Sequence, residues 1–180
     1  VLYDVENNYV LDGELAPLSK GERAMAISHL SCCQQGDLIL YDRGYPSYDF
    51  INYHSTNNLD YVMRVKISFS QRTLDFEKSK KRSQIVNIYP GKNTKLSDKS
   101  YDKTTPIKIR FIRVELAKGQ VEILMTSLLD IKMYPNNIFK ALYFKRWGVE
   151  TYYDELKNKL KVEHFSGYSR QTILQDFYAA

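Results

Sequence analysis

The decisive stretch of the chain reads Tyr143-Phe-Lys-Arg146-Trp-Gly-Val-Glu150-Thr-Tyr-Tyr-Asp-Glu-Leu-Lys157. On an α-helix each residue turns about 100° from the last, so Arg146, Glu150 and Lys157 fall within an arc of about 60°. An apolar stripe runs beside that arc, through Ile138, Leu142, Val149, Tyr153, Leu156 and Leu160. A solvated charged face would lie opposite such a stripe, so we expect the three charged residues to edge a cleft. The alternative is an ordinary surface pair of Arg146 with Glu150 at i,i+4.

Size and composition are those of an ordinary globular protein. With 180 residues, 43% hydrophobic and 26% charged, the chain can bury one sizeable core. No apolar run approaches the roughly 20 residues that span a bilayer, and no signal segment opens the sequence, so we expect a cytoplasmic protein without membrane partners. Adjacent Cys32 and Cys33 suit neither a disulfide nor spaced metal ligands, and His29, His54 and His164 are too scattered to predict a metal site.

Positive charge is concentrated in residues 64–118, which hold 15 of the 26 Lys and Arg but only 5 of the 21 Asp and Glu. A block of this kind is commonly a solvated face. At this density it is also the footprint expected of a protein that binds a phosphate backbone.

The first part of the chain predicts alternating strands and helices. An apolar hairpin around Glu6-Asn-Asn8 comes first, and Ser19-Lys-Gly-Glu22 has the pattern of a capping box before a helix. The expected elements are a hairpin of strands 1–5 and 9–11, a helix at 22–30, a strand at 37–41, a helix at 47–57 and a strand at 61–65.

Asp42 follows the apolar run 37–41 directly, in the sequence Asp42-Arg43-Gly44-Tyr45. A carboxylate just beyond a buried strand, next to a glycine that lets the chain turn, stands where α/β sheets assemble ligand and metal sites. The alternative is that Asp42 only caps the turn.

Residues 69–130 change character and predict a β-rich, basic insertion. Strands are expected at 85–89, 107–112 and 121–126, with a β-bulge at Ile112 where the alternation slips phase. Residues 78–82 and 91–105 are expected to be basic loops, and an Asn N-cap at 136–137 is expected to open one long helix that includes the decisive stretch. We therefore predict three parts: a core at 1–68, the insertion at 69–130 and the rest of the core at 131–180.

The order of these elements and the spacing of the decisive stretch resemble one family. Tyr143, Arg146, Glu150 and Lys157 match the Y-x2-R-x3-E-x6-K signature of a group of DDE transposases from bacterial insertion sequences, and Asp42-Arg-Gly-Tyr matches a second motif of that family. The resemblance covers essentially the whole chain. It implies an α/β fold of the ribonuclease H-like (RNase H-like) kind, a mixed sheet with flanking helices and the β-rich insertion, and activity in metal-dependent cleavage and transfer of DNA strands at transposon ends.

The resemblance also implies roles for individual residues. Asp42 and Glu150 would be catalytic carboxylates that hold two Mg²⁺ or Mn²⁺ ions, since in-line phosphoryl transfer needs charge neutralised by bridged cations. Tyr143, Arg146, Lys157 and Arg43 would bind DNA, the partner being double-stranded transposon ends and target. Trp147 would stack on a base, although core packing is its alternative role.

In one respect the chain departs from the family pattern. The first catalytic Asp of the family lies on a strand that precedes the hairpin, and neither Asp4 nor Asp12 occupies that position. We therefore expect a catalytic-domain fragment that lacks the first strand and is inactive in strand cleavage by itself, with the gap in its sheet exposed or filled by another segment.

Further expectations from the resemblance are a DNA hairpin intermediate, a homodimer in the synaptic complex and an association with the bacterial nucleoid. The competing interpretations are a non-catalytic DNA-binding remnant of a degenerate transposase and an RNase H-like nuclease of defence or repair.

Overall fold

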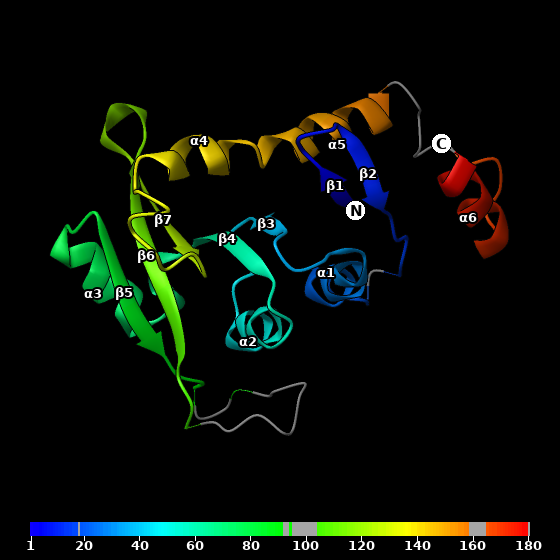
Figure 1. The fold of residues 1–180 in the computed structure, drawn as a ribbon. Helices are drawn as coiled ribbons and strands as arrows, with labels where there is room; N and C mark the ends of the chain where they lie inside the picture. The colour runs from blue at the N-terminus through cyan, green and yellow to red at the C-terminus, as the bar shows by residue number, and fades with distance from the viewer. Residues whose placement is uncertain (18, 92–93, 95–103, 159–164, 180) are drawn as a thin grey trace. The chain divides into compact units, whose positions relative to one another are not determined.

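The computed structural model describes residues 1–17, 19–91, 94, 104–158 and 165–179 (Figure 1). It divides the chain into two compact units, one of Cys33–Phe144 and one of Val1–Cys32 with Lys145–Ala180. Most of the expected loop at 91–105, together with Leu160 and His164, lies outside the described residues. The predicted three-part division into 1–68, 69–130 and 131–180 stays a prediction.

A five-stranded mixed sheet forms the centre of the unit Cys33–Phe144. Its strand order is β3-β4-β7-β6-β5, in which β3 runs parallel to β4 and the remaining neighbours are antiparallel. The predicted buried strands are confirmed, and this mixed α/β arrangement agrees with the expected RNase H-like fold. The strands are β3 (Leu38–Tyr41), β4 (Asp60–Val65), β5 (Ser83–Ile88), β6 (Ile107–Glu115) and β7 (Val121–Thr126).

Helices cover both faces of this sheet. On one face α2 (Tyr48–Thr56) and α3 (Gln71–Ser79) supply aromatic side chains, as where Phe76 stacks on Phe111 of β6 with ring centroids 5.5 Å apart. On the other face α4 (Ile138–Phe144) buries Phe139 and Tyr143 against Ile112 and Leu124. Figure 1 shows α2 and α4 on opposite sides of β4. Short 3-10 turns, η2 (Ile67–Phe69) and η3 (Ala117–Gly119), complete the unit.

The β-bulge predicted at Ile112 is wrong. Strand β6 pairs in unbroken register with β5 up to this position and with β7 on both sides of it. The alternation fails because both faces of the strand are covered: Ile109, Arg110, Phe111 and Ile112 are all fully buried. In a strand that is covered on both faces, consecutive residues are buried, so buried and exposed residues do not alternate along it.

Helix α3 was not expected, because residues 69–82 were interpreted as strands and basic loops. Ser70 caps this helix by accepting a hydrogen bond from the amide of Thr73 at 3.2 Å. The helix ends at Lys80, which takes the left-handed conformation with φ 52°. Its mixture of Arg, Asp, Glu and Lys concealed a pattern in which only Thr73 and Phe76 are buried.

In the other unit, the described residues form a separate hairpin and three α-helices. The hairpin pairs β1 (Leu2–Asp4) with β2 (Tyr9–Asp12), as predicted, and the Asp4 carboxylate closes its turn by accepting from the amides of Glu6 and Asn7. Tyr3 of β1 stacks on Tyr152 with centroids 5.1 Å apart. The helices are α1 (Glu22–His29), followed by the 3-10 turn η1 (Leu30–Cys32), α5 (Trp147–Asn158) and α6 (Arg170–Ala179).

Two expectations about helix ends are wrong. The predicted capping box at Ser19 does not form, since α1 begins after Gly21 without a side-chain cap. The single long helix of the decisive stretch is two helices, because α4 ends at Phe144 and α5 begins at Trp147. Between them the amides of Gly148 and Val149 bond to the carbonyls of Lys145 and Arg146, three residues back, so the chain makes a tighter turn there.

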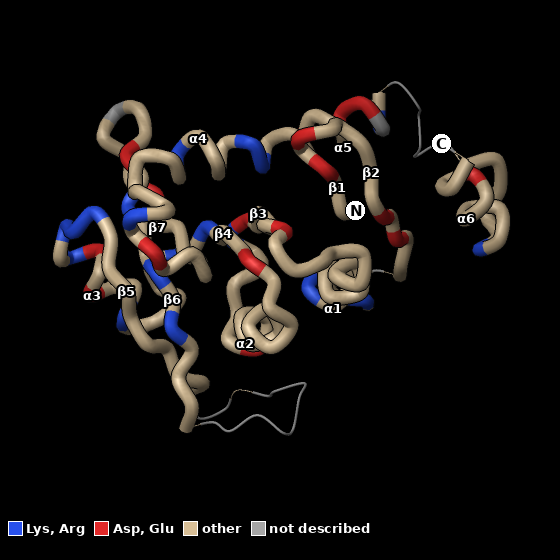
Figure 2. The backbone as a smooth tube through the Cα atoms, in the orientation of Figure 1, with Lys and Arg blue, Asp and Glu red and all other residues tan. Residues whose placement is uncertain are grey.

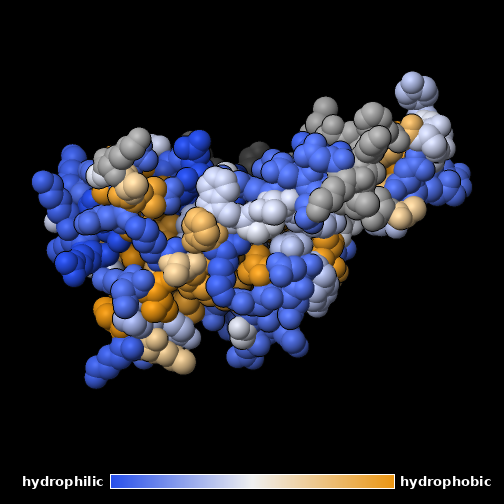
Figure 3. Space-filling model, turned by 90° about the horizontal axis from the view of Figure 1, so that it is seen from above, coloured by the Kyte–Doolittle hydropathy of each residue, from blue (hydrophilic) through white to orange (hydrophobic). Residues whose placement is uncertain are grey.

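None of the described helices has the length and apolar character that crossing a bilayer requires. On the face shown in Figure 3, hydrophilic side chains make up most of the surface and hydrophobic ones show in smaller areas between them.

His54 is a buried histidine with both ring nitrogens engaged. Nδ1 lies 2.8 Å from the carbonyl of Phe50 and Nε2 lies 3.0 Å from the hydroxyl of Tyr41. Burial lowers the pKa of His54, and the bond to Phe50 only partly opposes this. The ring is therefore neutral in the folded protein near pH 7.

The unfolded chain binds a proton at His54 at higher pH than the folded chain, so stability should fall as the pH drops below about 6.5. Between about pH 7.5 and about pH 5 the wild type should lose unfolding free energy through His54. We expect this loss to be smaller in His54→Gln, by up to about 2 kcal/mol. Urea unfolding of both proteins at the two pH values measures this. An equal pH dependence in the wild type and the variant would contradict the assignment.

Candidate functional site

Asp42 stands at the carboxyl end of β3, as the sequence predicted. The strand is apolar because it packs between helices, and its parallel pairing with β4 sets Tyr41 beside Met63. The amide of Tyr45 bonds to the carbonyl of Asp42 at 3.2 Å, which turns the chain away from the sheet and leaves the Asp42 side chain 39% exposed. The carboxylate thus lies at the edge where α/β sheets build sites.

Arg64, on β4, contacts that carboxylate directly. Its Nε and Nη2 lie 3.0 and 2.7 Å from Oδ1 of Asp42, while its Nη1 donates to Oε1 of Glu122 at 2.6 Å. Burial lowers the pKa of Arg64, but the bond to Glu122 and the charge of Asp42 outweigh this and raise it. The guanidinium is therefore a fixed cation shared between two carboxylates.

Tyr143, on α4, is buried, with only 6% of the residue exposed. Its hydroxyl donates to the carbonyl of Tyr41 at 3.2 Å, which ties α4 to the residue that precedes Asp42. The sequence suggested that this hydroxyl contacts DNA. In the structure it holds the end of β3.

The unit that carries α5 holds the remaining signature residues. Nη1 of Arg146 donates to Oε1 of Glu150 at 2.7 Å, an i,i+4 pair in which the Arg146 side chain is 9% exposed and that of Glu150 is 44% exposed. The guanidinium of Arg146 also lies 5.0 Å from the ring centroid of Trp147, whose side chain is largely exposed. Lys157 is exposed in the last turn of α5.

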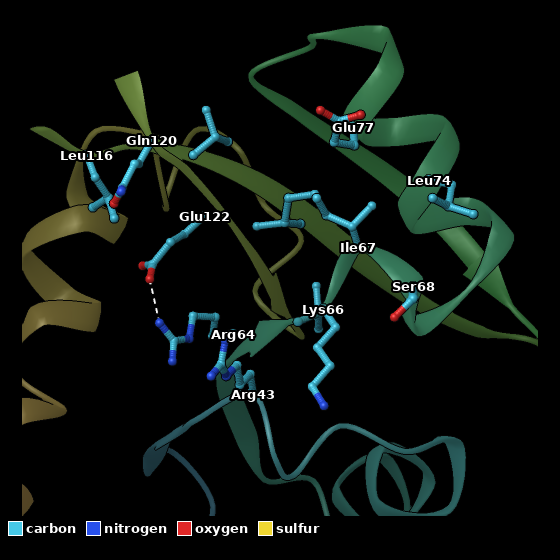
Figure 4. A pocket seen from close by; sticks show the side chains of 13 residues that line it. Arg43, Arg64, Lys66, Ile67, Ser68, Leu74, Glu77, Leu116, Gln120 and Glu122 are labelled. Carbon is cyan, nitrogen blue, oxygen red and sulfur yellow. Dashed lines mark hydrogen bonds and ion pairs between the residues drawn. The ribbon is translucent and has the colours of Figure 1, made fainter. Parts of the chain in front are cut away.

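An open hollow of about 670 Å³ lies beside Arg64 (Figure 4). Cationic side chains from Arg43, Arg64 and Lys66 line it together with Glu77 and Glu122, and most of the remaining lining is apolar, as at Ile67 and Leu74. Figure 4 shows Arg64 and Glu122 joined by an ion pair across this hollow. A ligand that carries both negative charge and apolar surface suits such a lining.

The basic block divides into structural and exposed cations. Arg110 is fully buried and donates to the carbonyls of Leu128 and Tyr134, and Arg113 donates to the carbonyl of Glu77. The exposed cations gather on α3 and the neighbouring strand ends, where Figure 2 shows Lys and Arg segments close together. Together with Lys66 beside the hollow, the exposed cations among the described residues of the block are Arg72, Lys78, Lys80, Lys81, Arg82 and Lys108.

The carboxylates suit a hard divalent cation, because Mg²⁺ and Mn²⁺ prefer oxygen ligands and keep several waters. Asp42 and Glu150 are each partly exposed, and each has one oxygen bonded to an arginine. Within the described residues, no group of three or more His, Cys, Asp or Glu side chains forms a ready metal cluster. The oxygen atoms of Asp42 and Glu150 are therefore suitable ligands for such a cation, and these two carboxylates are the candidate metal ligands.

Asp4 and Asp12 have other functions in the structure. Asp4 closes the hairpin turn, while Oδ2 of Asp12 lies 2.6 Å from Nδ1 of His29, a contact that lowers the pKa of Asp12. That neither residue takes the first catalytic role stays a prediction.

Arg64 and Glu122 were missed by sequence reasoning. One signal was present: Arg64 interrupts the otherwise apolar run of β4, whose neighbours Met63 and Val65 are buried. A charge in a buried strand needs a partner nearby.

The sequence model of one protein family, described as the transposase DDE domain, matches residues 1–180. A search of curated proteins gives no match to the chain.

The Tyr143 hydroxyl offers a direct test of the contact with β3. We expect Tyr143→Phe to lower the free energy of unfolding by about 1 kcal/mol, because the buried carbonyl of Tyr41 loses a donor. Tyr178→Phe is the matched control, since the Tyr178 hydroxyl also donates to a carbonyl, that of Gly13, but the residue is 65% exposed. Urea unfolding should show a change below about 0.5 kcal/mol for the control. Equal losses in both variants would refute the proposed difference.

Proposed function

The chain belongs to the family of the transposase DDE domain, and from that premise we propose that the full-length transposase containing this domain cleaves and transfers DNA strands at the ends of a bacterial insertion sequence of the Y-x2-R-x3-E-x6-K group. The observation that carries this proposal is the Asp42 carboxylate, partly exposed at the carboxyl end of a buried parallel strand and engaged by Arg64. The signature spacing from Tyr143 to Lys157 supports it.

Asp42 and Glu150 are the proposed metal ligands and catalytic residues. Two Mg²⁺ or Mn²⁺ ions, when bound, would supply Lewis-acid activation of the attacking oxygen and neutralise charge on the leaving oxygen. The protein's own contribution is to hold each carboxylate in place: Arg64 fixes one oxygen of Asp42, and Arg146 fixes one oxygen of Glu150. A third carboxylate is not assigned to any residue of this chain.

The proposed DNA contacts come from residues that surround these carboxylates in sequence. Arg43 is exposed beside Asp42, and Lys157 is exposed on α5, so both can reach phosphates. Trp147, 52% exposed, can stack on a base. Arg146 and Tyr143 keep their proposed DNA contacts in addition to their bonds with Glu150 and with the carbonyl of Tyr41.

The partners proposed from the family are double-stranded transposon ends and target DNA, bound by a homodimer in the synaptic complex. The same premise suggests a bacterial protein of the cytoplasm that associates with the nucleoid. A second candidate function is DNA binding without catalysis. The observation that favours it is the group of exposed cations on α3, which needs no metal site to bind DNA.

Cleavage, by the full-length transposase, of DNA that carries the element's ends separates these two functions. We expect Asp42→Asn and Glu150→Gln each to reduce Mg²⁺- or Mn²⁺-dependent cleavage at least about 100-fold, because each removes a charged oxygen ligand. DNA affinity should stay within about twofold, so that the loss is in the chemistry.

Asp154→Asn is the matched control, being an exposed carboxylate one turn beyond Glu150 on the same helix. Its cleavage rate should equal that of the wild type. Cleavage that survives both Asp42→Asn and Glu150→Gln would refute the catalytic assignment, and DNA binding without cleavage in every protein would favour the second candidate.

The cations at the end of α3 and just beyond it allow a separate test of DNA binding. We expect the triple variant Lys78→Gln, Lys80→Gln, Lys81→Gln to bind duplex DNA more weakly and to reduce the slope of log K against log salt by about 0.9 for each lost phosphate contact. Fluorescence anisotropy between about 50 and 200 mM salt measures the slope. Lys132→Gln, an exposed lysine outside the block, should leave it unchanged. Equal slopes for all three proteins would place the DNA elsewhere.

A further inference from the structure

We propose that Glu122 is a positioning residue, which shares the guanidinium of Arg64 with Asp42 and so sets how strongly the Asp42 carboxylate binds a divalent cation. This inference rests on the proposed role of Asp42 as a metal ligand. It concerns two residues, Arg64 and Glu122, that the signature does not include.

The sheet brings the three side chains together from three strands. Arg64 of β4 pairs with Leu124 of β7, so Glu122, two residues earlier in β7, projects from the same face of the sheet as Arg64. Asp42 follows Tyr41, which lies beside Met63, so Asp42 continues β3 alongside Arg64.

The contacts use opposite edges of the guanidinium group. Nε and Nη2 both lie on the Asp42 side, within 3.0 Å of one carboxylate oxygen, and Nη1 lies 2.6 Å from Glu122. A planar arginine holds two carboxylates in fixed directions in a way that a lysine cannot. Glu122 therefore determines where the positive charge of Arg64 lies relative to Asp42.

The charges of the group act in opposite directions on a metal ion. Arg64 repels a cation that approaches Asp42, while Glu122 offsets that repulsion and leaves the three-residue group with a net charge of −1. The side chains of Arg64, Glu122 and Asp42 are 26%, 21% and 39% exposed. Water and salt therefore screen their charges less than those of a fully exposed pair, while an ion from solution can still reach the Asp42 carboxylate. Figure 4 shows Arg64 and Glu122 lining the same open hollow.

Binding of Mn²⁺ to the metal-free chain tests this inference without any measurement of cleavage. We expect Arg64→Gln to strengthen Mn²⁺ binding at Asp42 at least about threefold, and Glu122→Gln to weaken it by a similar factor. Paramagnetic broadening of the backbone amide signals of Asp42 and Arg43 during a Mn²⁺ titration reports the affinity of this site. Thermal unfolding without metal confirms that each variant is folded.

Two further variants distinguish charge from structure. In the double variant Arg64→Gln, Glu122→Gln, the effect of losing Glu122 should shrink, because Glu122 acts through Arg64. In Arg64→Lys the charge remains, and Mn²⁺ affinity should stay below that of Arg64→Gln. If Arg64→Gln and Glu122→Gln both weaken Mn²⁺ binding, or neither changes it, the inference is wrong.

Asp42→Asn separates this outcome from a failure of the proposed function. Broadening of the Arg43 amide that Asp42→Asn abolishes supports Asp42 as a metal ligand, whatever Arg64 and Glu122 do. Broadening that persists in Asp42→Asn would overturn both the metal-ligand assignment and the inference built on it.

Discussion

The parallel pairing of β3 with β4 is the constraint on which the candidate site depends. Its register sets Tyr41 beside Met63, so that the next residue of each strand is a carboxylate on one and a guanidinium on the other. A slip of one residue would turn Arg64 to the opposite face of the sheet, where α2 packs, and would bury a charge without its partners. The buried side chains of Tyr61, Val62 and Met63 exclude such a slip, because each fits one face only.

A fully buried arginine on β6, Arg110, also positions the elements around the candidate site. Arg110 crosses from β6 to the segment that precedes α4, where it donates to the carbonyls of Leu128 and Tyr134 and to the side chain of Asn136, and its guanidinium lies 5.3 Å from the ring centroid of Phe139. Burial lowers its pKa, and only Asp130 opposes this through its charge. The cation is stabilised mainly by carbonyl dipoles, which fixes the start of α4 and hence the position of Tyr143 against β3.

The sequence predicted what local patterns determine. Apolar runs gave the strands at Leu38–Tyr41 and Val121–Thr126, and the turn residues after Tyr41 located Asp42 at a strand end. It could not predict Arg64 with Glu122, because these residues are 58 positions apart and meet only through the register of β4 with β7. The same limit explains the false bulge at Ile112: a second covering helix, α3, was needed to bury both faces of β6, and its polar composition concealed it.

The break between α4 and α5 divides the signature residues into two groups. A spacing of Tyr143, Arg146 and Glu150 suggests one continuous helical face, yet the helix ends at Phe144 and restarts at Trp147. Tyr143 therefore belongs with β3 and the Asp42 turn, while Arg146 and Glu150 form their own pair on the other side of the break. Each candidate metal ligand thus has an arginine on one oxygen, supplied from its own unit of the structure. A carboxylate that is held in this way loses little side-chain entropy when it binds an ion, but it also starts from a partly neutralised state. The affinity proposed for a metal ion would then be set by the balance between these two effects, and at Asp42 the residue proposed to adjust this balance is Glu122.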